Sequence, residues 1–195
     1  MSASSDPLFH RDRSCLLVID VQQYFLDKLP AEDRVPLVAR IGWLMRMARA
    51  LGVPTIATAE DIAQDGPLVP ELAALLPDGG KVFDKRIFGL AQQPDIRAAV
   101  EATGRDEHVL VGLETDVCIC HSALGLLAAG YRVAVIADAC GSPAPHHAAG
   151  LDRIRGGGAI VTTLKGITYE WVRDLATLAA LKRDMDIVLP PGLTL

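Results

Sequence analysis

The sequence predicts a three-layer α/β sandwich with a mainly parallel central sheet, formed by one domain spanning residues 1–195. Short apolar runs rich in Val, Ile and Leu alternate with segments in which apolar residues recur at helical spacing. The apolar runs are continuous, as is typical of parallel strands that helices bury on both faces. Because strand and helix alternate along most of the chain, helical crossovers between parallel strands are the favoured connection.

Composition limits the classes of partner. The net charge is −5 and Lys and Arg form no cluster, which argues against a nucleic-acid surface. No apolar run approaches the roughly 18 residues that a membrane span needs. The four cysteines fit neither a disulfide framework nor paired zinc spacing, and the N-terminus does not resemble a signal peptide. We therefore expect a reduced cytoplasmic protein with a small-molecule substrate.

The elements can be placed in order. Residues 1–13 are polar and rich in turn-forming residues, so we expect a loosely held surface arm. The polar segment 60–70 contains Gly66, Pro67 and Pro70 and predicts a loop. The apolar runs predict strands at residues 15–19, 53–59, 81–84, 109–111, 132–137 and 159–163. Helical spacing predicts helices at residues 35–51, 71–76, 94–103, 119–129, 148–154 and 170–181.

Cys118 is placed to act as a nucleophile. It follows the predicted strand 109–111 at a tight turn, in which Thr115 and Asp116 can cap the next helix. A cysteine in the first helical turn lies near unpaired N–H groups and the positive end of the helix dipole, which favour the thiolate. Local sequence alone favours the alternative that Cys118 is a small core residue, as most free cysteines are.

Two further residues strengthen the case for a site. Asp20 comes directly after the first predicted strand, and Lys85 follows the short strand 81–84. Taken singly, Asp20 could cap a helix and Lys85 could be a solvated surface residue. Because ligands bind at the carboxyl ends of strands in open α/β sheets, an acid, a lysine and a cysteine at that edge predict a catalytic cluster.

Other motifs have plainer interpretations. The run Gly156–Gly158 follows a helix and precedes a strand, whereas phosphate loops connect a strand to a helix, so we interpret it as a helix terminator. His146 and His147 are adjacent and lack a third ligand at a useful spacing, which favours a solvated or capping role over metal binding. Cys118 and Cys120 lack the C-x-x-C spacing of thioredoxin-like motifs.

The residues also resemble a known family, the isochorismatase-like cysteine hydrolases, which includes nicotinamidases and N-carbamoylsarcosine amidases. The resemblance runs from about Ser14 to Asp174 and rests on LLVIDVQQYF, FDKRIFG, VGLETDVCICHSALGLLAAGYRVAVIADAC and GAIVTTLKGITYEWVRD. It implies a catalytic triad of Asp20, Lys85 and Cys118. It also implies a cis peptide bond before Glu114, and an oxyanion held by the backbone amides of Glu114 and Cys118.

The resemblance implies a covalent mechanism. Asp20 would take the thiol proton, Lys85 would hold that carboxylate, and the thiolate would attack a carbonyl carbon. Asp20 would then protonate the leaving amine and activate water. Phe25 resembles the aromatic residue that packs against the substrate in this family, although a core role for Phe25 is nearly as well supported.

The positions that depart from the family pattern limit which metal and substrate we expect. Nicotinamidases carry an Asp and two His residues for a metal beside the pocket, whereas TAEDIAQDGP offers Glu60 at the acidic position and no histidine. We therefore expect no cofactor and no metal, and place Glu60 among the substrate-binding residues. Isochorismatases proper do not need the thiol, so Cys118 favours cleavage of a small amide or related C–N bond. The resemblance also implies a homo-oligomer, supported by the apolar stretch Ala123–Ala129.

Three alternatives stay open. The chain could be an isochorismatase-type hydrolase of another small molecule. A non-catalytic scaffold on this fold would have no need to keep all three groups of the triad. A thiol-redox protein would need a resolving cysteine close to Cys118, and Cys120 would point elsewhere on a helix.

Overall fold

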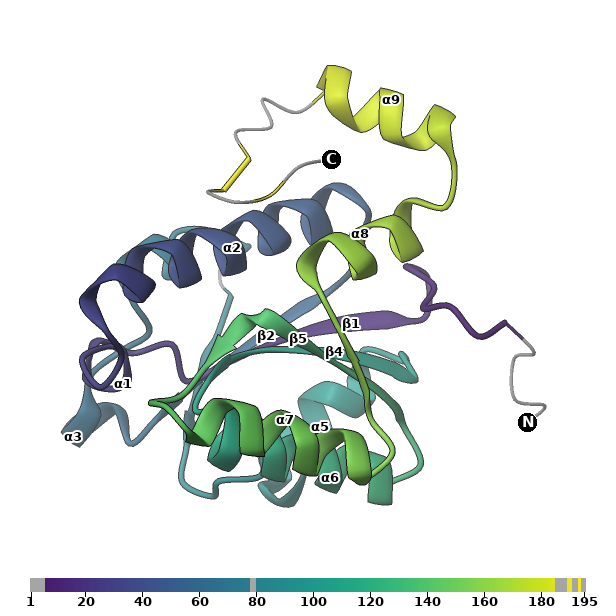
Figure 1. Cartoon of the computed structure of the whole chain (residues 1–195). Coiled ribbons are helices and arrows are strands. Elements are labelled where there is room, and N and C mark those ends of the chain that lie inside the picture. Colours follow the sequence, from purple (N-terminus) through teal and green to yellow (C-terminus); the bar gives the residue numbers. More distant parts are fainter. Residues whose placement is uncertain (1–5, 78–79, 185–188, 191–192, 194–195) are drawn as a thin grey trace.

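A six-stranded, all-parallel sheet with the order β3-β2-β1-β4-β5-β6 forms the centre of the molecule. The computed structural model describes residues 6–77, 80–184, 189–190 and 193. The strands are β1 (Ser14–Ile19), β2 (Thr55–Glu60), β3 (Val82–Lys85), β4 (Glu107–Leu113), β5 (Arg132–Gly141) and β6 (Ile160–Thr162). Figure 1 shows helices on both faces of this sheet, which confirms the predicted three-layer sandwich.

One helical layer comes from the two ends of the chain and the other from its middle. One face is covered by α2 (Ala31–Ala50) and α8 (Leu164–Val172), and α9 (Leu175–Asp184) lies outside these helices, away from the sheet (Figure 1). The other face is covered by α5 (Pro94–Ala102), α6 (Cys120–Ala128) and α7 (His146–Gly156). Short helical turns complete the chain: α1 (Gln23–Leu26), α3 (Ile62–Asp65), α4 (Pro70–Ala73), η1 (Leu90–Gln92) and η2 (Thr115–Ile119).

Strand periodicity divides the core into two clusters. In β1, Leu16 and Val18 belong to the cluster that also contains residues of α2 and α8, while Cys15, Leu17 and Ile19 belong to the cluster under α5, α6 and α7. All six residues of β1 are buried. Successive side chains of a strand point to opposite faces, so a continuous apolar run lets β1 contribute to both cores.

Several element boundaries differ from the sequence prediction. β5 extends to Gly141, four residues beyond the predicted end, and its register against β4 shifts between Leu110 and Gly112. The single helix predicted at 170–181 is wrong: α8 ends at Val172 and α9 begins at Leu175. Arg173 separates the two helices with a positive φ of 69°, a conformation that helical periodicity cannot reveal. The prediction that Gly156–Gly158 ends a helix agrees with the end of α7 at Gly156.

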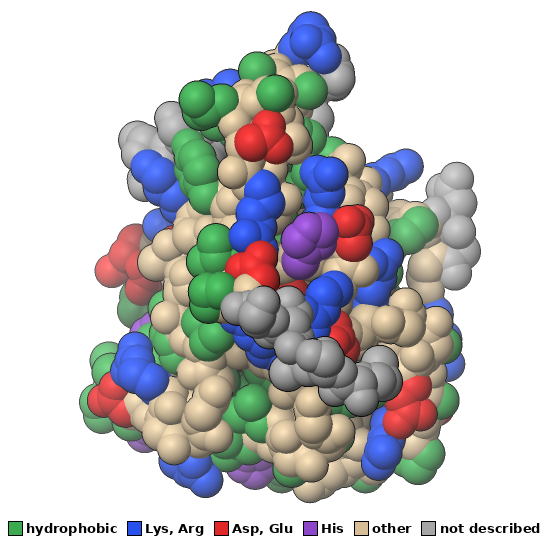
Figure 2. Space-filling model, turned by 90° about the vertical axis from the view of Figure 1, so that its right-hand side faces the viewer, with side chains coloured by type: hydrophobic (Ala, Val, Ile, Leu, Met, Phe, Trp, Pro, Cys, Tyr) green, Lys and Arg blue, Asp and Glu red, His purple; other side chains and the backbone are tan. Residues whose placement is uncertain are grey.

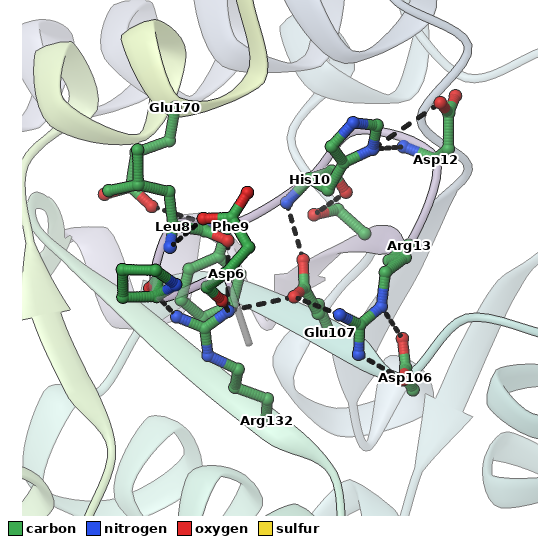
Figure 3. Close-up of polar contacts among 12 residues, drawn as sticks. Asp6, Leu8, Phe9, His10, Asp12, Arg13, Asp106, Glu107, Arg132 and Glu170 are labelled. Atoms are coloured by element: carbon green, nitrogen blue, oxygen red, sulfur yellow. Dashed lines mark hydrogen bonds and ion pairs between the residues drawn. The ribbon is translucent and has the colours of Figure 1, made fainter. Parts of the chain in front are cut away.

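The N-terminal segment is held at more points than its polar composition indicates. Phe9 is fully buried, and its backbone N–H donates to a carboxylate oxygen of Glu170 over 2.7 Å. The buried carboxylate of Glu107 accepts the backbone N–H of His10 and forms ion pairs with Arg13 and Arg132 (Figure 3). Residues 6–13 are therefore joined to β4, β5 and α8 through a polar network.

The outer surface carries mixed charge. On the face that Figure 2 draws, Lys and Arg side chains of the described residues lie beside Asp and Glu side chains. Within the described part of the chain, no helix is long and apolar enough to cross a membrane.

Candidate active site

The three predicted catalytic side chains meet at the carboxyl ends of neighbouring strands. Asp20 follows β1, Lys85 is the last residue of β3, and Cys118 lies in the η2 turn after β4. Lys85 Nζ is 3.0 Å from Asp20 Oδ2 and 3.6 Å from Cys118 Sγ. All three residues are buried, with at most 2% of their surface exposed. The fold thus assembles the cluster that the sequence predicts.

Glu60, the last residue of β2, is the fourth member of the cluster. Its Oε2 atom lies 2.8 Å from Lys85 Nζ and accepts a hydrogen bond from the Cys118 thiol over 3.1 Å. The sequence favours a substrate-binding role for Glu60, whereas in the structure this oxygen contacts the nucleophile and the lysine. Because β2 lies between β3 and β1 in the sheet, its end brings Glu60 between Lys85 and Asp20.

Local backbone conformation aims Asp20 into the site. Asp20 has a positive φ of 52°, which turns the chain sharply at the end of β1. Few residues other than glycine adopt this conformation without cost, although Asp does so more readily than most. Thr58 Oγ1, on the adjacent strand, donates to Asp20 Oδ1 over 2.7 Å. Sequence reasoning misses Thr58, because a threonine inside a strand carries no signal of such a contact.

A buried glutamine fixes the backbone of Glu60. Gln22 Oε1 accepts the Glu60 N–H over 2.6 Å, and Gln22 Nε2 donates to the Glu60 carbonyl over 2.7 Å. Gln22 Nε2 also donates to the carbonyl of Gly66. Sequence reasoning misses this positioning role too, since the sequence indicates only that Gln22 is a polar residue near the sheet edge.

The turn that carries Cys118 is braced from two sides. The peptide bond between Leu113 and Glu114 is cis, and the Glu114 carbonyl accepts the amides of Val117 and Ile119. Thr115 Oγ1 is hydrogen-bonded to His147 Nδ1 over 2.8 Å, and Ser142 Oγ donates to Asp116 over 2.7 Å. The expectation that the Glu114 and Cys118 amides bind an oxyanion remains a prediction.

A close contact between β1 and β4 lies directly beneath this turn. Gly112 has a φ of +124°, and a Cβ atom there would lie 2.0 Å from the carbonyl oxygen of Ile19. Only glycine allows the two strands to approach in this way. The approach occurs one residue before Asp20 and two residues before Glu114, so it joins the backbone that carries Asp20 to the turn that carries Cys118.

Burial dominates the electrostatics of the cluster. Desolvation raises the pKa of Asp20 to about 6, although the nearby Lys85 charge and the Thr58 hydrogen bond act in the opposite direction. Desolvation, followed by the Asp20 charge, also raises the pKa of the Cys118 thiol. For Lys85, burial alone would lower the pKa, but the charges of Asp20 and Cys118 outweigh it and the pKa is raised.

These directions correct one inference from the sequence. The position of Cys118 near a helix start predicts a thiol with a lowered pKa, whereas its pKa is raised, because burial and nearby carboxylates outweigh the dipole. Cys118 also lies in the single π-helical turn η2 rather than in the first turn of α6. The thiol therefore needs a neighbouring proton acceptor before it can attack.

The same atoms bear on metal binding. Among the described residues, Asp20, Glu60 and Cys118 form a group whose ligand atoms all lie within 4.8 Å of one another. The Lys85 ammonium contacts each of the three, at 3.0, 2.8 and 3.6 Å. A metal ion there would have to displace Lys85, so the arrangement fits a bound ammonium better than a metal. That the protein needs no metal remains a prediction.

The remaining candidates lie elsewhere. Phe25 is 4% exposed and belongs to the core cluster on the α2 face, whereas Cys118 belongs to the cluster on the opposite face. The Phe25 ring also lies 4.4 Å from Lys28 Nζ, which pairs with Glu114, so its substrate-binding role remains a prediction beside the core role. Cys15, Cys120 and Cys140 are free and buried, and burial raises the pKa of Cys15 and of Cys140 to about 12.

Comparison with known proteins shows the family to which this chain belongs. The family described as "Isochorismatase domain" matches residues 14–166. Among curated proteins, an isochorismatase domain-containing protein 2 from Bos taurus is 33% identical over 181 residues, covering 92% of this chain and 84% of that protein. The probable hydrolase YcaC of Escherichia coli is 33% identical over 142 residues, covering 69% of this chain and 68% of that protein.

Solved structures have the same fold. The crystal structure of Escherichia coli YcaC, described as an octameric hydrolase of unknown specificity, superimposes with a TM-score of 0.80 at 28% identity, covering 92% of this chain and 91% of that one. An N-carbamoylsarcosine amidase from Thermoplasma acidophilum matches with a TM-score of 0.66 at 22% identity, covering 78% of this chain and 96% of that one. The second likeness shows the fold alone.

Proposed function

Because the chain belongs to the isochorismatase-like cysteine hydrolase family, we propose that it hydrolyses a small amide or related C–N compound through an acyl-enzyme on Cys118. The observation that carries this proposal is the contact of one thiol with a buried ammonium and a carboxylate, at 3.6 and 3.1 Å. Such a cluster supplies a nucleophile, a proton acceptor and a compensating positive charge without any cofactor.

The proposed reaction has two halves. In the first, the thiol proton passes to a carboxylate of the cluster, sulfur attacks the carbonyl carbon, and the amine leaves with a proton from Asp20. In the second, Asp20 takes a proton from water, hydroxide attacks the thioester, and the acid is released. The amides of Glu114 and Cys118 would hold the oxyanion, an arrangement worth about 3 kcal/mol per donor.

One relative supports the class of chemistry. Escherichia coli YcaC, 33% identical over 142 residues, is described as a probable hydrolase. Asp20, with a pKa raised to about 6, is suited to gain and lose a proton near neutral pH. These properties favour C–N hydrolysis over a scaffold or a redox role.

The test combines turnover with intact mass. We would assay the protein against primary amides, carbamoyl compounds and isochorismate, and record its mass during turnover. A mass increase equal to the acyl group, mapped to Cys118 and absent in Cys118→Ala, supports the proposal. Cys120→Ala is the matched control, because Cys120 is a buried free thiol two residues away and should retain full activity. Turnover by Cys118→Ala above a few per cent of the parent would exclude the covalent mechanism.

We also propose that the protein forms a homo-oligomer. In the apolar stretch Ala123–Ala129, Ala123 and Leu126 are buried in the chain's own core, whereas Ala128 and Ala129 are exposed. A groove of about 630 Å³ along the outer side of α2 is a better candidate, and Val35 within it is 75% exposed. Escherichia coli YcaC is octameric. Light scattering at micromolar concentration should give a multiple of the chain mass of 20.8 kDa, and a monomer would contradict the proposal.

A further inference from the structure

The carboxylate to which the nucleophile donates its hydrogen bond belongs to Glu60. The Cys118 thiol donates to Glu60 Oε2 over 3.1 Å, and Lys85 Nζ donates to the same oxygen over 2.8 Å. Asp20 Oδ1 accepts from Thr58 and Oδ2 pairs with Lys85, and the Cys118 thiol also interacts with the Asp20 carboxylate. Sulfur, Glu60 and Lys85 thus form one chain of contacts through a single oxygen atom.

The two carboxylates occupy different environments. The side chain of Glu60 is 19% exposed, whereas that of Asp20 is completely buried. A partly exposed carboxylate keeps water contacts that stabilise its charge, while burial favours the protonated form. Two carboxylates in unlike environments are how enzymes assign separate acid and base roles.

The backbone of Glu60 is fixed by hydrogen bonds to a buried side chain. Buried Gln22 bonds to both its N–H and its carbonyl, over 2.6 and 2.7 Å. These two hydrogen bonds fix the position of the Glu60 Cα atom. The side chain therefore reaches the Cys118 sulfur from a fixed point of the backbone.

We propose that Glu60 is a fourth catalytic residue, which takes the Cys118 proton as sulfur attacks and returns it when the acyl group leaves. The S–H bond breaks, an O–H bond forms on Glu60, and the sulfur electron pair forms the S–C bond. Asp20 enters the reaction protonated; it gives this second proton to the leaving amine and takes one back from water. This inference rests on the proposed function and reassigns one step that the family resemblance gives to Asp20.

Charge balance favours this internal transfer. The charged groups that act on the thiol are Asp20, Lys85 and Glu60. If the thiol lost its proton to solvent, the cluster would gain one negative charge in a buried site that holds a single ammonium. Transfer to Glu60 leaves the total charge of the cluster unchanged, which costs less where water is excluded.

The two routes predict different pH dependences of thiol reactivity. A thiolate formed by internal transfer does not depend on pH while Glu60 carries the negative charge. A thiolate formed by loss of a proton to solvent rises about tenfold per pH unit below the thiol pKa. Iodoacetamide measures the reactivity of the thiolate in either case and needs no known substrate. The sulfur forms the new S–C bond, and iodide leaves.

The experiment measures the second-order rate of Cys118 alkylation by iodoacetamide between about pH 7 and pH 9, above the pKa of about 6 of Asp20. For the parent protein we expect a flat profile, and for Glu60→Gln a rate that rises about tenfold per pH unit. Asp61→Asn is the matched control, since it removes a neighbouring carboxylate that pairs with Arg86 outside the cluster, and should keep the flat profile. Glu60→Asp restores the charge at a shorter reach and should give an intermediate profile.

Two results would overturn the inference. One is a flat profile in Glu60→Gln together with a sloping profile in Asp20→Asn, which would make Asp20 the acceptor. The other is faster alkylation of Glu60→Gln with the same pH profile as the parent. Glu60 would then act on the thiol only through its negative charge and would not accept its proton. Failure of the proposed function looks different, since the label would then map to a cysteine other than Cys118. Thermal melting verifies that each variant is folded.

Discussion

Lys85 Nζ lies 3.0 Å from Asp20 Oδ2, and both side chains are fully enclosed by protein. Removing water from two such charges costs several kcal/mol per ion, and their mutual attraction offsets that cost only while both are present. Glu60 and Cys118 contact the same ammonium, so three groups depend on one positive charge. The lysine is therefore a structural element of the sheet edge, in addition to the catalytic role that we propose for it.

Lys85→Met should lower the free energy of unfolding by about 3 kcal/mol at pH 8, because it leaves a buried carboxylate without its counter-ion. Urea unfolding measures the change. At pH 5 the loss should be smaller, since Asp20 can then take up a proton. Lys81→Met is the control: this lysine is 64% exposed and 4.0 Å from Asp95, so its removal should alter stability little. Equal losses in the two variants would contradict the prediction.

His108 should make the protein sensitive to acid. Its ring nitrogens have no hydrogen-bond partner among the described residues, and burial lowers its pKa from 6.5 to about 4. As the pH falls below 6.5, the unfolded chain takes up this proton before the folded protein does, so stability is lost down to about pH 4. Asp20 acts in the opposite direction, because its raised pKa lets the folded state bind a proton first, from about pH 6 downward.

The difference between the parent and His108→Phe isolates the histidine contribution. Phe keeps the edge contact that the ring makes with Tyr131, whose centroid lies 4.5 Å away, but cannot take up a proton. Between pH 7 and pH 4.5 the parent should lose about 2 kcal/mol more stability than the variant, measured by denaturant unfolding. Parallel curves for the two proteins would exclude His108 as the cause.

Gly112→Ala should disrupt the site and the sheet together. The new methyl group would meet the Ile19 carbonyl, and a φ of +124° is strained for any residue with a Cβ atom. We expect a loss of about 3 kcal/mol or more in the free energy of unfolding, or failure to fold. Gly104→Ala is the matched control, because its φ is also positive at 65° but no atom lies within 4 Å of the new Cβ. It should cost only about 1 kcal/mol.

Activity should need no added metal. The Lys85 ammonium already contacts the three ligand atoms that could hold an ion. Dialysis against a chelator should leave turnover and the rate of Cys118 alkylation unchanged, and added zinc should not protect the thiol. Restoration of lost activity by zinc, manganese or iron would show that a metal does displace the lysine.

The sequence predicts the site's members better than their roles. Asp20, Lys85 and Cys118 follow strands that the apolar runs place correctly, because the ends of parallel strands share one edge. The apolar run before Glu60 predicts a strand that ends at residue 59 and leaves Glu60 in a loop near the substrate; in the structure β2 ends at Glu60 itself. That one-residue extension places its carboxylate beside Lys85.

Other features depend on contacts between distant residues. The pKa of Cys118 depends on burial and on charges from three other strands, none of which a local helix-start argument includes. The positive φ values of Asp20 and Arg173 leave no periodic pattern. The ion pairs that join Arg13 and Arg132 to Glu107 connect segments about a hundred and twenty residues apart in sequence, with composition indicating only a polar arm.

The chain carries every reactive group of the cluster within its first 118 residues, yet residues nearer the C-terminus shape the turn that presents the last of them. His147 bonds to Thr115, Ser142 bonds to Asp116, and Gly150 leaves no room for a Cβ atom against the Asp116 backbone, 2.8 Å away. During synthesis, the acid, the lysine and the thiol therefore emerge before the segment that aligns them. A chain interrupted after α6 would hold the acid, the lysine and the thiol but would lack these three contacts with the turn that carries Cys118, so we expect its thiol to be poorly aligned with Lys85 and Glu60.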